Sequence, residues 1–169
     1  MKQENCTIEW IGGPCPIVGD IRNYRPDDGS ACLHIFDSNR PKYFTGPERD
    51  LFGAYLQRAD QPFFVAEVEG QVRACGGFRI DDFGVSFLEW GMVHQNWHRR
   101  GVGANLLQWR LDRIRQIGHA WCVLIDTSQH TAPFFARFGF ESFRIIADGY
   151  QPGLDKVFMR LVWAPRPDS

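Results

Sequence analysis

The stretch VHQNWHRRGVGANLL, residues 93–107, places two glycines one residue apart between an extended apolar segment and an amphipathic one. Residues 85–93 carry the bulky side chains of a strand, and apolar residues then recur at helical spacing over residues 101–117. Gly118 is suited to end that helix. The stretch therefore predicts a strand that passes into a helix through a mouth of small residues.

The predicted helix is amphipathic. Its apolar positions are Val102, Leu106, Leu107, Leu111 and Ile114. Arg110, Arg113 and Arg115 are expected away from this apolar face. A helix of this kind packs its apolar face against a sheet, so the sequence predicts an α/β domain built around this strand and helix.

Earlier in the chain, apolar runs separated by turn residues predict further elements. A strand or short helix is expected near residues 31–37, and a helix is expected to begin at Pro47 and end near Gln61-Pro62. Glu69-Gly70 is suited to join strands 63–68 and 71–80 in a hairpin.

Later in the chain, residues 121–126 form an almost wholly apolar run that predicts a buried parallel strand. A short helix over 131–138 and two further strands after residue 140 are expected to follow. Residues 1–30 carry frequent glycine and proline and are predicted to be irregular. The sequence shows no repeat and no second domain, so we expect residues 1–169 to form a single domain.

Composition limits the classes of function. The formal net charge of -1 gives no general reason to expect a nucleic acid or membrane partner. The sequence has no run of roughly 18–20 apolar residues and no signal pattern, so a cytoplasmic protein is expected. The five cysteines are scattered and are expected to be free thiols. The histidines lack metal-ligand spacing, so no metal is expected.

Residues 101–103, at the start of the predicted helix and called the glycine mouth below, are suited to bind an anion. Gly101 and Gly103 leave the amides of the first helical turn accessible, the helix dipole favours negative charge there, and Arg99 and Arg100 add positive charge. A solvated turn is the alternative. The dinucleotide fingerprint is not met, because Leu106 stands at its third glycine, and no Gly-Lys-Ser/Thr follows as a Walker motif requires.

The stretch 93–107 resembles the coenzyme A signature of the GNAT N-acetyltransferases, (Arg/Gln)-x-x-Gly-x-(Gly/Ala) after a strand ending in Val. A second stretch, IDTSQHTAPFFARFGFE over residues 125–141, resembles the later strand and the helix ending in Gly-Phe of that family. The resemblance implies a GNAT fold in the α/β class. In that fold a twisted, mixed, mostly antiparallel sheet of about seven strands has a splayed parallel pair at its centre and about four flanking helices.

Two residues depart from the family pattern. His98 stands where the family usually carries Arg or Gln, at a position where the backbone matters more than the side chain. Phe135 stands where many members carry a tyrosine that protonates the departing thiolate, so that role has no phenol here.

The resemblance implies an acyltransferase that moves an acetyl group from acetyl-coenzyme A to a primary amine by direct attack in a ternary complex. Backbone groups of Met92 and Val93 are expected to contact the pantetheine arm and supply oxyanion donors. Ser128 aligns with an asparagine that bonds the pantetheine, or else caps the following helix. The full set expected at the cofactor is Met92, Val93, Arg99, Arg100, Gly101, Val102, Gly103, Ala104, Ser128 and Phe135.

Glu89 is the expected general base. Strand alternation would place it on one face with Phe87, Gly91 and Val93, directed toward the implied thioester. The alternative is an ordinary carboxylate paired with an arginine. The acid stays open among Ser128, His130, Tyr150 and solvent, the choices that follow the loss of the tyrosine.

The acceptor is a small-molecule or peptide amine that the sequence does not identify. The family builds its acceptor cleft from regions equivalent to residues 36–44 and 148–155, whose aromatic and acidic residues suit a cationic, partly apolar amine. Phe36, Tyr43 and Phe44 are alternatively core residues. A homodimer is compatible with the sequence. Competing hypotheses are a non-catalytic acyl-coenzyme A sensor or interaction module and a nucleotide-binding domain.

Overall fold

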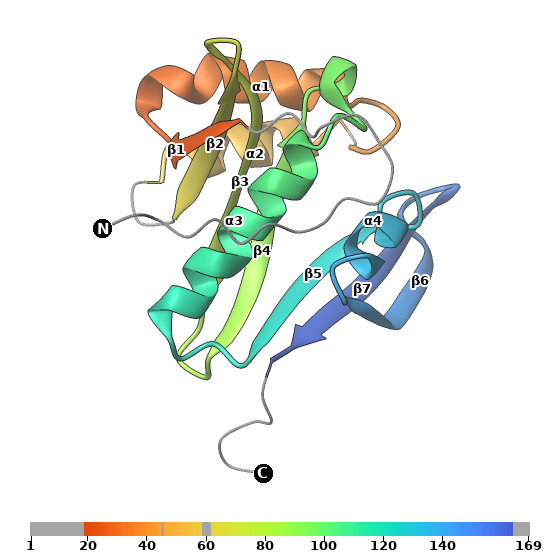
Figure 1. Ribbon diagram of the computed structural model, residues 1–169. Helices are drawn as coiled ribbons and strands as arrows, with labels where there is room; N and C mark the ends of the chain where they lie inside the picture. The colour runs from red at the N-terminus through yellow and green to blue at the C-terminus, as the bar shows by residue number, and fades with distance from the viewer. Residues whose placement is uncertain (1–18, 45, 59–61, 164–169) are drawn as a thin grey trace.

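The computed structural model describes residues 19–44, 46–58 and 62–163 of the chain. One seven-stranded sheet has the order β1-β2-β3-β4-β5-β7-β6, and only the central pair β4–β5 is parallel (Figure 1). This confirms the mixed, mostly antiparallel sheet that was expected. The strands are β1 Asp20–Asn23, β2 Phe63–Val68, β3 Gln71–Ile80, β4 Val85–Val93, β5 Cys122–Ser128, β6 Glu141–Gln151 and β7 Leu154–Val162.

Four α-helices flank the sheet within the described ranges. They are α1 Gly29–Ser38, α2 Glu48–Leu56, α3 Val102–Ile117 and α4 Ala132–Ala136, and two 3-10 turns, η1 Pro26–Asp28 and η2 Gln95–Trp97, precede α1 and α3. Figure 1 shows α3 crossing in front of β3 and β4, with α4 beside β5 and β7.

Local sequence signals located most elements correctly. Strands 63–68, 71–80 and 85–93 have the predicted bounds, and the segment near residues 31–37 lies in helix α1. Helix α2 ends at Leu56, earlier than predicted, and residues 59–61 lie outside the described part of the chain. The segment predicted to be irregular contains β1, and its residues 1–18 are likewise outside the described ranges.

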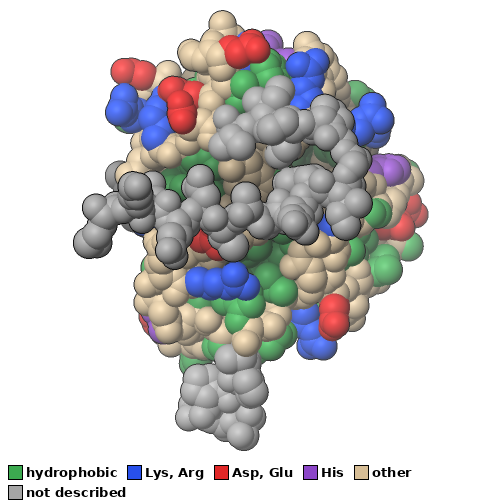
Figure 2. All heavy atoms as spheres, in the orientation of Figure 1, with side chains coloured by type: hydrophobic (Ala, Val, Ile, Leu, Met, Phe, Trp, Pro, Cys, Tyr) green, Lys and Arg blue, Asp and Glu red, His purple; other side chains and the backbone are tan. Residues whose placement is uncertain are grey.

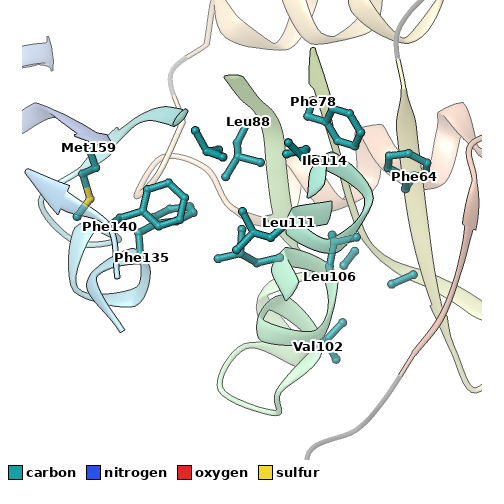
Figure 3. Packing of buried hydrophobic residues seen from close by; sticks show 14 of the residues in the cluster. Phe64, Phe78, Leu88, Val102, Leu106, Leu111, Ile114, Phe135, Phe140 and Met159 are labelled. Atoms are coloured by element: carbon teal, nitrogen blue, oxygen red, sulfur yellow. The ribbon is translucent and has the colours of Figure 1, made fainter. Parts of the chain in front are cut away.

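Two apolar clusters cover the two faces of the sheet. The larger cluster packs α3 and α4 on the sheet, and in Figure 3 its helix residues Ile114 and Leu111 lie near Phe78 and Leu88. The smaller cluster packs α1 and α2 on the opposite face and includes Met92. These two clusters identify the face to which each β4 side chain points.

The predicted alternation of β4 is wrong beyond Glu89. Trp90 has a left-handed backbone (φ 48°), and the register against β3 shifts between Cys75 and Gly77. Leu88 therefore joins the α3 cluster, whereas Met92, also even-numbered, joins the cluster under α1 and α2. A bulge of this kind reverses the facing of the residues beyond it. Glu89 thus lies on the opposite face from Gly91 and Val93.

The expected placement of Arg110 away from the apolar face is also wrong. Its side chain is 3% exposed and lies against the sheet, where Nη1 donates to the Gly77 carbonyl at 3.2 Å. A Cβ atom on Gly76 or on Gly91 would lie 2.8 Å from the Arg110 guanidinium. The glycines of β3 and β4 therefore leave the space that this buried arginine occupies.

We predict that Gly91→Ala destabilises the protein by about 1–3 kcal/mol, because the new methyl group overpacks the site of Arg110. The penalty should shrink in an Arg110→Met background, since all three nearest atoms to the new Cβ belong to Arg110. Urea unfolding of the four members of this double-mutant cycle measures the coupling.

Gly53→Ala is the matched control, because a Cβ there meets nothing within 4 Å. This substitution in α2 should stabilise the protein by about 0.5–1 kcal/mol. Equal costs for Gly91→Ala with and without Arg110 would contradict the packing argument.

An ion-pair network fixes the edge of the sheet. Arg22 on β1 donates two hydrogen bonds to the Asp28 carboxylate, at 2.7 and 2.8 Å, and its Nε donates to Glu67 on β2 at 2.8 Å. The bond from Arg22 and a further bond from the Arg25 amide hold the pKa of Asp28 below its usual value. The network joins β1, β2 and the turn before α1.

We predict that Arg22→Gln lowers the free energy of unfolding at pH 7 by on the order of 1–3 kcal/mol. Because the pKa of Asp28 is lowered in the folded state, the stabilisation exists above the unfolded pKa of about 3.9 and is lost as pH falls through the folded pKa. Urea titrations from pH 7 to pH 3 should show the difference between wild type and variant narrowing below about pH 4. An unchanged difference at pH 3 would count against the assignment.

Candidate functional site

The central parallel pair opens toward one end. Strands β4 and β5 pair only over Val85–Phe87 and Cys122–Leu124, so the later residues of β4 have no strand partner on that side. A strand-like ligand can add its own hydrogen bonds to such an edge. The opening lies at the end of β4 that leads into α3.

Val93 presents its backbone to this open edge. His94 N–H donates to the Arg73 carbonyl of β3, so by strand alternation the Val93 N–H and C=O point the other way. Asn39 Nδ2 and His98 Nε2 both donate to the Val93 carbonyl, each at 2.8 Å. The Val93 N–H has no acceptor among the described residues and remains available.

Met92 is not equivalent to Val93, although both were expected at the cofactor. It pairs with Cys75 of β3, so its backbone groups point into the sheet, and its side chain is buried under α1 and α2. Of the two predicted oxyanion donors, only Val93 therefore directs its amide to the open edge.

The mouth of α3 lies beside Val93. Gly101 has φ 89°, a left-handed conformation that a side chain would strain. A Cβ on Gly103 would lie 3.2 Å from a Val93 methyl group and 3.9 Å from the Phe134 ring. Side-chain caps are absent from this helix start, and the amides of Val102, Gly103 and Ala104 have no acceptor within the described ranges.

The basic residues at this mouth are exposed. Arg99 has a left-handed backbone (φ 60°), and the Arg100 guanidinium lies 4.9 Å from the centre of the Trp97 ring. Both cations stand next to amides that carry the positive end of the helix dipole. The residues predicted to bind a diphosphate are therefore gathered in one place by the structure.

Glu89 lies on the other face of β4. Arg79 Nε donates to its Oε1 at 3.1 Å, so the predicted alternative of an arginine-paired carboxylate is present. Its other oxygen, Oε2, is buried and accepts no hydrogen bond from the described residues. A buried carboxylate oxygen without a hydrogen-bond donor lowers the stability of the fold.

Tyr55 of α2 stands close to that carboxylate. Its hydroxyl is also buried and forms no full hydrogen bond with the described residues, but the Glu89 carboxylate is a neighbouring acceptor, and a Cβ on Gly77 would lie 2.9 Å from the hydroxyl. Burial raises the pKa of Tyr55, and the Glu89 charge raises it further, so the phenol stays protonated. On the opposite face of the sheet, burial lowers the pKa of Arg110 to about 10, so its guanidinium is still charged at neutral pH.

Ser128 and Phe135 lie at the far side of the opening. Ser128 is buried at the end of β5, and its hydroxyl lies 3.4 Å from that of Thr131, while no side-chain hydrogen bond caps α4. Phe135 is 5% exposed and packs edge-on against Phe140 in the large cluster. Phe135 is therefore part of the hydrophobic core.

Two other candidate acids differ in their surroundings. Tyr150 donates to the Asp126 carboxylate at 2.7 Å, and burial, followed by the Asp126 charge, raises its pKa. His130 is exposed. Among the described residues, neither forms a hydrogen bond or an ion pair with Glu89.

Sequence reasoning missed Asn39, Tyr55 and the burial of Arg110. Asn39 and Tyr55 follow or lie in helices far from β4 in sequence, so no local pattern joins them to the site. Arg110 did leave a signal, because Gly76-Gly77 and Gly91 interrupt two strands that would otherwise carry side chains.

The residues present fit coenzyme A. The described residues hold no group of three His, Cys, Asp or Glu side chains suited to a metal. The open strand edge and the uncapped glycine mouth match an amide-containing arm and a diphosphate.

Within the described ranges, no helix is long and apolar enough to cross a membrane.

Solved structures share this fold. A protein from Desulfovibrio desulfuricans assigned to the GNAT family aligns over 86% of this chain and 99% of its own, with 22% identity and a TM-score of 0.73. The ribosomal-protein-S18-alanine N-acetyltransferase of Escherichia coli aligns over 90% and 99%, with 18% identity and a TM-score of 0.72. The protein yncA of Salmonella typhimurium, solved with its cofactor acetyl-CoA, aligns over 89% and 98%, with 20% identity and a TM-score of 0.70.

These identities establish the fold alone. No curated protein sequence is significantly similar to this chain. The family model of the acetyltransferase (GNAT) family, however, matches residues 30–140, which is more than half of the sequence and includes β4, the glycine mouth and α3. The chain therefore belongs to the acetyltransferase (GNAT) family of acyltransferases.

Proposed function

We propose that the protein transfers an acetyl group from acetyl-coenzyme A to a primary amine by direct attack in a ternary complex. The observation that carries this proposal is the meeting, at the end of β4, of an unpaired strand edge and an uncapped glycine mouth. One ligand with a diphosphate and an amide-containing arm can satisfy both at once.

The cofactor would be held from the α3 side. The amides of Val102, Gly103 and Ala104 would donate hydrogen bonds to the diphosphate oxygens, and Arg99 and Arg100 would add positive charge. The pantetheine arm would lie along the open edge, with the Val93 N–H available to it or to the thioester oxygen. Ser128, on β5, lies across the opening from β4.

The acceptor would approach from the face that carries α1 and α2. The Glu89 side chain lies on that face and is 22% exposed, and its carboxylate is the group that would take the proton from an alkylammonium. The neutral amine nitrogen then attacks the thioester carbonyl, the carbon–sulfur bond breaks, and the thiolate of coenzyme A leaves with the electron pair. The proton that the nitrogen loses on becoming an amide passes to that thiolate or to water. Because of the bulge at Trp90, Glu89 lies on the face opposite to α3. Both Glu89 and the start of α3 are nevertheless close to the unpaired end of β4.

No proton donor for the thiolate is assigned. Phe135 has no ionisable group, and Tyr150 already donates to Asp126. Coenzyme A thiolate is a good enough leaving group to depart with limited help.

A non-catalytic acyl-coenzyme A-binding module is the second candidate. It is favoured by the Arg79 partner of Glu89 and by the phenylalanine at position 135. Tight cofactor binding with no release of coenzyme A across a broad amine panel would identify it.

We predict that Gly103→Leu weakens acetyl-coenzyme A binding about tenfold or more in calorimetry, because the side chain meets Val93 and covers the first-turn amides. Gln116→Leu, at an exposed position further along α3, is the control and should bind normally. If Gly103→Leu bound acetyl-coenzyme A with normal affinity, the glycine mouth would not be part of the binding site.

We predict that Glu89→Gln lowers kcat about 100-fold or more while leaving acetyl-coenzyme A affinity unchanged. The pH dependence of kcat/KM should lose the limb that the base contributes. Glu141→Gln, an exposed carboxylate at the start of β6, is the control. A full rate with the wild-type pH profile in Glu89→Gln would exclude Glu89 as the base.

A further inference from the structure

A cavity adjoins the end of β4 beside the C-terminal end of α1. It has a volume of about 450 Å³ and lies between the segment that follows α1 and the loop that leads into α3. We name it the cationic cavity, and its main lining residues are Asn39, Arg40, Lys42, Tyr43, His98 and Arg99. Gln95 N–H donates to Ser38 Oγ at 3.2 Å, which ties the two walls together.

Its charged lining residues are all cations. Figure 1 draws η2 and the segment between α1 and α2 at the upper right, where Figure 2 shows Lys and Arg side chains. Arg40 approaches Asp37 only at 3.9 Å, and that carboxylate is bound by Arg49 at 2.7 Å. Lys42 lies 5.1 Å from the Tyr43 ring centre. Among the described lining residues there is no carboxylate to balance Arg40, Lys42 and Arg99.

The inner wall is held in place by hydrogen bonds. Asn39 is 4% exposed and donates to the Ile35 and Val93 carbonyls, each at 2.8 Å. His98 donates to the same Val93 carbonyl, and its ring contacts Tyr43 edge-on. These bonds join the cavity to the strand end that borders the thioester site.

The cavity faces the acceptor side. It is walled by the segment after α1, whose helix packs on the Glu89 face, whereas the Val93 side chain and Gly103 lie on the α3 face. Val93 is the fourth residue after Glu89 on β4, so the cavity lies about 10–13 Å from the base along the strand. An acceptor whose amine reaches Glu89 can extend into it.

We propose that the cationic cavity binds an anionic group of the acceptor, a carboxylate or a phosphate, so that the substrates are amines with negative charge about 10 Å from the nitrogen. This deepens the proposed acetyl transfer and rests on it. It also replaces the expectation, drawn from the aromatic and acidic residues of segments 36–44 and 148–155, of a cationic acceptor, because the segment near residues 38–43 presents Arg40 and Lys42 to the cavity. The other source of such an anion is a phosphate of coenzyme A itself.

A binding test separates these two sources without requiring turnover. With acetyl-coenzyme A at saturation and ionic strength held constant, inorganic phosphate should raise the Tm of the wild-type protein. It should not raise the Tm of Arg40→Gln/Lys42→Gln, whose exposed side chains can be changed without opening the core. Arg113→Gln/Arg115→Gln, two exposed arginines of α3, is the charge-matched control and should respond as the wild type does.

Two results of that test overturn the proposal. An equal response of the wild type and Arg40→Gln/Lys42→Gln, or no response in either, removes the cavity as an anion site. A phosphate effect that appears only when acetyl-coenzyme A is omitted assigns the cavity to the cofactor.

A kinetic test then addresses the substrate class. Coenzyme A release should be faster with 8-aminooctanoate than with 8-aminooctanamide, with kcat/KM higher by about tenfold or more for the acid. The ratio should fall toward one in Arg40→Gln/Lys42→Gln. Equal kcat/KM for acid and amide overturns the proposal but leaves acetyl transfer intact, whereas no release with any amine refutes acetyl transfer and leaves the phosphate test to judge the cavity.

Discussion

The left-handed backbone of Trp90 sets the relation between the two halves of the site. A tryptophan rarely adopts positive φ, and here the surrounding rings of Phe36, Phe52 and Tyr55 hold its side chain in the small cluster. The bulge reverses the facing of β4 between Glu89 and Gly91. Because of that reversal, the strand directs a carboxylate to one face and packs against the α3 mouth on the other.

The open edge depends on how the central strands part. Parallel pairing stops at Phe87 and Leu124, and the last residues of β4 curve away with α3 attached to them. An unpaired edge in the middle of a sheet leaves backbone donors and acceptors without partners, which the chain only partly satisfies through Asn39 and His98 at the Val93 carbonyl. The Val93 residue with its remaining free amide lies beside the uncapped start of α3, where a Cβ on Gly103 would be 3.2 Å from a Val93 methyl group.

Buried charge accompanies this opening. Arg110 lies against Gly76 and Gly91 on the α3 face of the sheet. Tyr55, beside Glu89, lies against Gly77 on the other face. Glycines without side chains therefore leave room for polar groups on both faces of the sheet. Buried polar atoms without partners cost stability unless a ligand satisfies them. Arg110, Tyr55 and Glu89 each leave one such atom among the described residues. These buried polar atoms without partners lower the stability of the fold next to the proposed reaction centre.

The sequence alone determined the bounds of strands β2, β3 and β4, the approximate extent of α3 and the glycine mouth, because periodicity and turn chemistry act over a few neighbouring residues. It also placed Gly101 and Gly103 where a helix follows a strand, while their role in binding stays a prediction. Only the tertiary structure decided the facing of Glu89, the burial of Arg110 and the cations that line the cavity beside Val93. Each of these depends on contacts between segments far apart in the chain, whose energies no local pattern contains.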